Sequence, residues 1–177
     1  MFDKEVLVSK YKRIHIIGSV ASGKTTLAKR LSSTWDIPYY ELDNVVWKRY
    51  KSGDVRRTAK EREDYLRKLV QTESWIVEGV HNEPWVEESF RKADVIIFLD
   101  MKYSVRTYRI IKRFIFQKLR IEKSNYKPTM KVFFKMFKWN KQFEKNGKPH
   151  FFHEFSYLHN KVFLVRNNRC LKRILEM

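Results

Sequence analysis

The stretch GSVASGKT, residues 18–25, fits the pattern G-x-x-x-x-G-K-[ST]. Glycines in this pattern let the main chain turn tightly, so that its N–H groups surround a phosphate. The lysine reaches the outer phosphates and the final hydroxyl ligates magnesium. The pattern therefore predicts a loop that binds a nucleoside triphosphate with Mg²⁺. The residues predicted to contact the nucleotide are Gly18, Ser19, Ala21, Ser22, Gly23, Lys24, Thr25 and Thr26.

The flanking residues have the order that such a loop requires. YKRIHII before the loop is typical of a strand, and KTTLAKRLSSTW after it is typical of an amphipathic helix with Leu27 and Leu31 on one face. A glycine-containing turn between ordinary elements is the alternative interpretation. The strand, loop and helix order favours the phosphate loop.

Strand-like and helix-like segments alternate along the rest of the chain. This alternation predicts an α/β fold with a parallel sheet covered by helices on both faces, which is a three-layer arrangement. Further strands are expected at 38–42, 73–78, 94–99 and 161–165, and helices near 57–72, 83–92, 102–119, 129–145 and 168–176.

Ligands of such sheets bind beyond the carboxyl ends of the strands, where several candidate side chains occur. Asp43 is expected to orient or deprotonate an acceptor hydroxyl or to hold magnesium through water, with a helix N-cap as the alternative. Glu78 is expected to hold magnesium through water, with a buried structural acid as the alternative, and Gly79 would leave room for substrate. Asp100 is read as a strand end, although it could serve the same metal, and His81 is a candidate for substrate contact.

The positive charge is concentrated in one segment. The net charge is +18, and residues 102–148 carry 15 Lys or Arg against two acidic residues. Such a segment is expected to face phosphate on a nucleotide, a nucleic acid or an anionic surface. Ten of the 27 aromatic residues also fall there. Aromatics interleaved with lysines can stack on unpaired bases, although core packing is the alternative.

Four cations in this segment recur at helical spacing: Lys102, Arg106, Arg109 and Arg113. Spacings of four, three and four place them on one face of a helix. Guanidinium groups aimed at one place suit a transferring phosphoryl group, so Arg106 and Arg109 are predicted to be catalytic with Lys24 and Asp43. A solvated helix face is the alternative.

Length and composition limit the remaining possibilities. A chain of 177 residues fits one domain, predicted to span 1–177. We expect no secretory signal and no membrane partner, because no apolar run approaches the ~20 residues of a membrane span. Cys170 is the single cysteine, which excludes a disulfide framework and a thiolate zinc site and favours a cytoplasmic protein.

Several segments together resemble a known family. GSVASGKT, PYYELDNVVW, WIVEGV, DVIIFLD with YSVRTYRIIKR, and FKMFKWN are similar to the DNA topology modulation proteins of the FlaR type, which are adenylate-kinase-like P-loop proteins. The resemblance covers nearly the whole chain. It implies a P-loop NTPase kinase fold with a five-stranded parallel sheet. It also implies a mobile, basic helical lid over 102–150 that brings Arg106 and Arg109 over the phosphates, and a place for Arg166 near the adenine.

One departure from adenylate kinases bears on the acceptor. Those enzymes carry a phosphate-binding arginine after the third strand, where this chain has Glu78, Gly79, Val80, His81 and Asn82. The departure argues against a nucleoside monophosphate acceptor and leaves room for a small hydroxylated or other acceptor. Two functions remain open: an ATP- and Mg²⁺-dependent phosphotransferase of unknown acceptor, and an ATP-responsive protein that binds DNA through 102–148 and modulates its topology.

Overall fold

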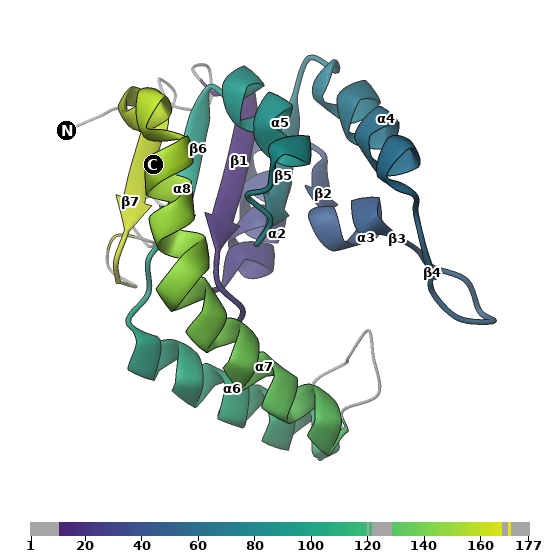
Figure 1. Cartoon of the computed structure of the whole chain (residues 1–177), viewed down its shortest axis with the longest axis vertical. Coiled ribbons are helices and arrows are strands. Elements are labelled where there is room, and N and C mark those ends of the chain that lie inside the picture. The colour runs from purple at the N-terminus through teal and green to yellow at the C-terminus, as the bar shows by residue number, and fades with distance from the viewer. Residues whose placement is uncertain (1–10, 120, 122–128, 168–169, 171–177) are drawn as a thin grey trace.

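A five-stranded parallel sheet forms the centre of the computed structural model (Figure 1), which describes residues 11–119, 121, 129–167 and 170. Its strand order is β2-β5-β1-β6-β7, and every neighbouring pair is parallel. The α/β fold predicted from the sequence is therefore confirmed. The strands are β1 (Arg13–Gly18), β2 (Tyr39–Glu41), β5 (Trp75–Gly79), β6 (Val95–Leu99) and β7 (Val162–Val165).

Strand β1 is buried on both faces because it lies in the middle of the sheet. Ile14 and Ile16 belong to one hydrophobic cluster and Ile17 to another, as expected for successive side chains that point to opposite faces. His15 lies on the same face as Ile17, with its ring centroid 4.1 Å from that of Phe90. This double burial explains the nearly continuous apolar run that precedes the phosphate loop.

Helices cover both faces of the sheet. In Figure 1, α4 (Ala59–Val70), α5 (Glu87–Lys92) and α8 (Lys148–Glu154) lie in front, and α2 (Lys24–Trp35) lies behind. Helix α4 begins with the capping box that the sequence suggests. The Glu61 N–H donates to the Thr58 hydroxyl over 3.2 Å, and the Glu61 carboxylate accepts from the Thr58 N–H over 2.9 Å.

The basic segment folds into a helical hairpin at the carboxyl edge of the sheet (Figure 1). Helix α6 (Tyr103–Lys118) packs beside α7 (Met130–Gln142). The chain then continues through a π-helical turn η2 (Phe143–Gly147) into α8. The sequence predicted one helix over 129–145 and no helix over α8. Pro149 does not end the run, because it lies in the first turn of α8, where its missing N–H costs no hydrogen bond.

Short elements complete the described structure. Helix α3 (Leu42–Val46), the two-stranded ribbon of β3 (Trp47–Lys48) and β4 (Val55–Arg56), and the 3₁₀ turns η1 (Pro84–Val86) and η3 (Ser156–Lys161) have no counterpart of their own in the sequence prediction. The helix predicted near 168–176 lies outside the described residues, apart from Cys170. Within the described ranges, none of the helices has the length and apolar content that a membrane span needs.

Candidate phosphate-binding site

The loop 18–25 connects the central strand β1 to helix α2. Ala21 has φ 59° and Gly23 has φ 104°, both in the left-handed region. For Ala21 this backbone conformation costs roughly 1–2 kcal/mol, which is typical of a functional loop. A Cβ at Gly18 would lie 2.9 Å from the Leu99 carbonyl oxygen and 2.9 Å from Ser22 Oγ. Glycine at position 18 is thus required by the close approach of β6.

The beginning of α2 offers main-chain donors to an anion. Gly23 is the N-cap and has no side chain to cap the helix, and no acidic residue occupies the first turn. The N–H groups of that turn and the helix dipole together favour a negative group. Ser22 Oγ is buried and has no hydrogen-bond partner in the part of the chain that the structure describes. These features fit a bound phosphate.

The Lys24 side chain folds back over the loop. Its ammonium donates to the Ser19 carbonyl oxygen over 2.9 Å. Burial holds the pKa of Lys24 below its ordinary value, and the nearby Glu78 and Asp43 carboxylates offset part of this shift. A half-buried cation beside an open turn of N–H groups is placed to pair with the outer phosphates of a nucleotide.

Thr25 of helix α2 and Glu78 of strand β5 are hydrogen-bonded to each other at this edge. The Thr25 hydroxyl donates to Glu78 Oε1 over 2.6 Å. Glu78 is 4% exposed, and burial raises its pKa, while the Lys24 ammonium and the Thr25 hydrogen bond lower it. A hydroxyl and a carboxylate oxygen held this close are ligands that Mg²⁺ prefers. Among the described residues, no group of three or more His, Cys, Asp or Glu side chains could by itself hold a metal.

A buried polar chain joins the loop to the helical hairpin. The Ser19 hydroxyl donates to Asn140 Oδ1 over 3.1 Å, and the Asn140 amide donates to Thr107 Oγ1 over 3.4 Å. Ser19 and Asn140 are both fully buried. Sequence reasoning missed Asn140, although a polar residue four positions after Met136, on the buried face of an aromatic-rich helix, was a usable signal.

The two arginines predicted to act together have different surroundings. Arg109 Nη1 donates to the Ser22 carbonyl over 2.9 Å and to the Ala21 carbonyl over 3.4 Å, so its guanidinium lies at the loop. Arg106 is 1% exposed and forms an ion pair with Glu144. Its guanidinium also lies over the rings of Tyr103 and Phe143. Arg106 thus links α6 to the segment after α7, and only Arg109 of this pair contacts the loop.

The acceptor side of the edge is more open. The Asp43 side chain is 67% exposed on α3, and its Oδ1 lies 3.9 Å from His81 Nε2. His81 Nδ1 is in turn 3.1 Å from Glu83 Oε2. The space beside Gly79 is filled, because a Cβ there would lie 2.7 Å from Leu42 Cδ1. The expectation that Gly79 leaves room for substrate is therefore wrong, and this glycine serves the packing of α3.

Arg166 and Asp100 lie together at the end of the sheet nearest β7. The Arg166 side chain is 71% exposed, and its Nε lies 3.9 Å from Asp100 Oδ2. Lys148 Nζ donates to the other oxygen of Asp100 over 2.7 Å. Asp100 is thus paired with Lys148 of α8 and with Arg166 after β7. This arrangement agrees with the prediction that Asp100 ends a strand.

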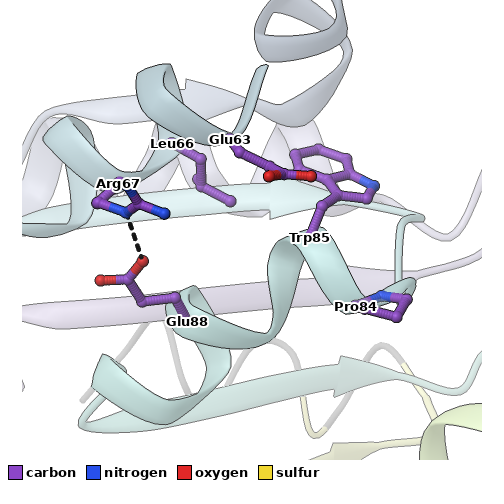
Figure 2. Close-up of a pocket in the computed structure, with 6 residues that line it drawn as sticks. All are labelled: Glu63, Leu66, Arg67, Pro84, Trp85 and Glu88. Atoms are coloured by element: carbon purple, nitrogen blue, oxygen red, sulfur yellow. Dashed lines mark ion pairs between the residues drawn. The ribbon is translucent and has the colours of Figure 1, made fainter. Parts of the chain in front are cut away.

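A shallow pocket of about 290 Å³ lies elsewhere, between α4 and the η1–α5 segment. Figure 2 shows Trp85 and the Arg67–Glu88 pair, 3.7 Å apart, among its six lining residues. None of these six belongs to the loop 18–25, and Glu63, Arg67 and Glu88 present mixed charges to solvent. The polar geometry at the carboxyl edge of the sheet, rather than this pocket, marks the candidate site.

Comparison with known proteins agrees with this geometry. No protein family model matches the chain. A shikimate kinase of Aquifex aeolicus (strain VF5) is 40% identical over 57 residues, which cover 32% of this chain and 34% of that protein. The chain thus matches about a third of the length of this relative.

Solved structures resemble the chain over nearly its whole length. A shikimate kinase from Bacteroides thetaiotaomicron superimposes with a TM-score of 0.57 at 16% identity, covering 94% of this chain and 95% of that one. A shikimate kinase from Acinetobacter baumannii in complex with shikimate gives 0.55 at 12% identity, covering 92% and 90%. The chain has the P-loop kinase fold of the shikimate kinases.

Proposed function

We propose that this protein is an ATP- and Mg²⁺-dependent P-loop kinase that phosphorylates a hydroxyl group of a small molecule. The observation that carries the proposal is the phosphate loop, with Lys24 and Arg109 at its rim and the Thr25–Glu78 pair beside it. The fold shared with shikimate kinases supports the same reaction class.

The loop residues would hold the nucleotide and its metal. Main-chain N–H groups of Gly18, Ser19 and Ala21 to Thr26 would surround the phosphates, with Thr25 and Glu78 near Mg²⁺. The metal, when bound, neutralises charge on the phosphate oxygens. Lys24 and Arg109 would add fixed positive charge where negative charge develops during transfer. Arg166, at the opposite end of the edge, would contact the base.

Asp43 is the proposed acceptor-side residue. Its exposed carboxylate lies beside His81 and close enough to Lys24 to affect the pKa of that ammonium. A carboxylate at this place can orient an acceptor hydroxyl and accept its proton. Arg106 is assigned a positioning role in place of a catalytic one, because its guanidinium is buried against Glu144.

Transfer of labelled phosphate tests this function. The protein would be incubated with γ-labelled ATP, Mg²⁺ and a panel of hydroxylated small molecules, of which shikimate is the first because a structural relative binds it. We expect at least one labelled product with the parent protein and none with Lys24→Ala. Lys29→Ala, an exposed lysine of the same helix, is the matched control. Failure of the whole panel, together with equal ATP affinity of the parent and Lys24→Ala proteins, would contradict the proposal.

The DNA-related alternative depends on different residues. Its basis is the charge of residues 102–148 and the resemblance to topology modulation proteins, and no relative described above is named as DNA-binding. Affinity for duplex and single-stranded DNA, measured at several salt concentrations with and without ATP, tests it. Binding by several phosphate contacts predicts a steep loss of affinity with salt.

A further inference from the structure

Helix α6 carries an apolar stripe on the side that faces away from α7. The stripe consists of Tyr108, Ile111, Ile115 and Leu119, which are 63%, 40%, 47% and 62% exposed. Their spacings of three, four and four residues place them on one face, opposite the buried Ile110. A solvent-facing helix side normally carries polar residues, so this stripe requires a separate explanation.

Cations flank the stripe, and neither α6 nor α7 carries an acidic side chain. Helices α6 and α7 together contain nine Lys or Arg residues and no Asp or Glu. Lys112 and Lys118 flank the stripe on α6 and are exposed. On α7, Phe134 is 63% exposed, and Lys131, Lys135 and Lys138 are exposed near it. Each of the two helices therefore exposes apolar and cationic side chains together.

These two properties together distinguish among possible partners. A second copy of the chain would bring two hairpins of the same charge sign together, and their repulsion opposes pairing. Nucleic acid would satisfy the lysines, but Ile111, Ile115 and Leu119 can neither stack on bases nor pair with them. An anionic bilayer offers phosphate headgroups to the cations and an acyl boundary to the aliphatic side chains.

We propose that the exposed face of α6 that carries this stripe docks on anionic membrane surfaces. The apolar stripe would enter the boundary between headgroups and acyl chains, with α6 parallel to the surface and Lys112 and Lys118 at headgroup level. No membrane span is required, so the expectation of no membrane partner, which was based on the lack of a span, does not exclude such docking.

The orientation leaves the candidate active site usable. Arg109 and Asn140 face the phosphate loop from the inner side of the same two helices. The hairpin can therefore contact a surface with one side and the nucleotide loop with the other. This inference does not depend on the proposed kinase reaction, because it concerns different side chains of the hairpin.

Sedimentation with vesicles tests the proposal. The full-length protein would be mixed with vesicles of phosphatidylcholine alone or with 30% phosphatidylglycerol at physiological salt. We expect binding only to the anionic vesicles. Lys112→Glu/Lys118→Glu is expected to lower the partition coefficient at least about tenfold, because each basic residue near an anionic surface contributes to binding. Ile115→Ser/Leu119→Ser is expected to lower it by a similar factor, since both residues would lose insertion.

Matched controls change the same chemistry elsewhere. Lys60→Glu/Lys68→Glu on α4 makes an equal change in net charge at exposed positions, and Tyr50→Ser/Val55→Ser removes apolar groups that are 55% and 53% exposed. Both controls are expected to change binding less than about twofold. The same variants would be titrated with single-stranded and duplex oligonucleotides.

Three results would overturn the proposal. These are equal binding to neutral and anionic vesicles, unchanged vesicle binding of Ile115→Ser/Leu119→Ser, and binding of oligonucleotides without binding of anionic vesicles. One pattern would support the proposal even if oligonucleotides bind. In that pattern, vesicle binding depends on both the lysine pair and the Ile115–Leu119 pair, whereas oligonucleotide binding depends only on Lys112 and Lys118. Circular dichroism of each exposed-site variant verifies that it is folded.

Discussion

Two adjacent parts of the sheet edge are held in different ways. On the phosphate side, Ser19 and Glu78 are buried and hydrogen-bonded to side chains from other elements. On the acceptor side, the Asp43 side chain is 67% exposed, and its Oδ1 lies 3.9 Å from His81 Nε2. The phosphate side is therefore organised before a ligand binds, and the acceptor side depends on its ligand to fix the geometry. Substitutions on the two sides should accordingly affect different measured quantities.

The largest effect is expected for Lys24→Ala. Loss of the ammonium should lower the rate of phosphoryl transfer by about 10³-fold, because a fixed positive charge at the transferring group is removed. Calorimetry with MgATP should show weaker binding as well. Lys29→Ala should retain the parent values. A Lys24→Ala protein with the parent rate would show that the loop does not serve catalysis.

Asp43→Asn should affect turnover alone. A lost general base lowers the rate by about 10²-fold or more, while MgATP affinity should stay within about twofold of the parent, since Asp43 lies on the acceptor side. Steady-state kinetics with the identified acceptor, together with calorimetry, separates the two quantities. If MgATP affinity falls in parallel with the rate, Asp43 belongs functionally to the phosphate side, and the contrast between the two sides is wrong.

Asn140→Ala is expected to have a smaller effect, on nucleotide affinity. Removal of the amide leaves the buried Ser19 hydroxyl without its acceptor, and the affinity for MgATP should fall about tenfold. Ser19→Ala combined with Asn140→Ala should cost less than the sum of the single changes, because both remove one interaction. Lys141→Ala, on the exposed side of the same helix, is the control. Strictly additive effects would show that the Ser19–Asn140 bond is not responsible.

The smallest effect concerns pH. Burial raises the pKa of Glu78 above its ordinary value. Above about pH 4.5 the Glu78 carboxyl ionises in the unfolded chain but stays protonated in the folded protein, so the folded protein binds more protons. The free energy of unfolding therefore falls as pH rises, until Glu78 has ionised in the folded protein as well. Relative to Glu78→Gln, the parent should lose free energy of unfolding between pH 4.5 and neutrality, as measured by urea unfolding. A difference that grows in the opposite sense would show that the Thr25 and Lys24 contacts outweigh burial.

The phosphate side could be predicted from the sequence because its chemistry depends on local spacing. Gly18, Gly23, Lys24 and Thr25 are close in sequence, and the backbone of one turn fixes their arrangement. The central strands β1, β5 and β6 were also predictable, since burial on both faces gives each a short apolar run. The partner of Ser19, by contrast, lies 121 residues away on α7, and only tertiary packing brings the two together.

The arginine stripe shows the limit of helical spacing. Arg106 and Arg109 are three residues apart and share a helix side, as predicted. The spacing of residues along a helix does not show, however, which residues of other elements lie beside each side chain. Glu144 comes from the π-helical turn after α7 and binds Arg106, while the loop carbonyls bind Arg109. The long run into α8 was missed for a related reason, because Gly147 and Pro149 are typical of a break yet fit a first helical turn.

The π-helical turn η2 joins two segments with different anchors. Asn140, just before it, is bonded to the phosphate loop, whereas Phe151, after it, lies in the aromatic core beneath β6 with Phe90 and Phe98. A wider helical turn is a common place for a helix to bend. We expect α7 to tilt about this turn while α8 stays fixed, so that exchange of one nucleotide for the next requires no rearrangement of the sheet.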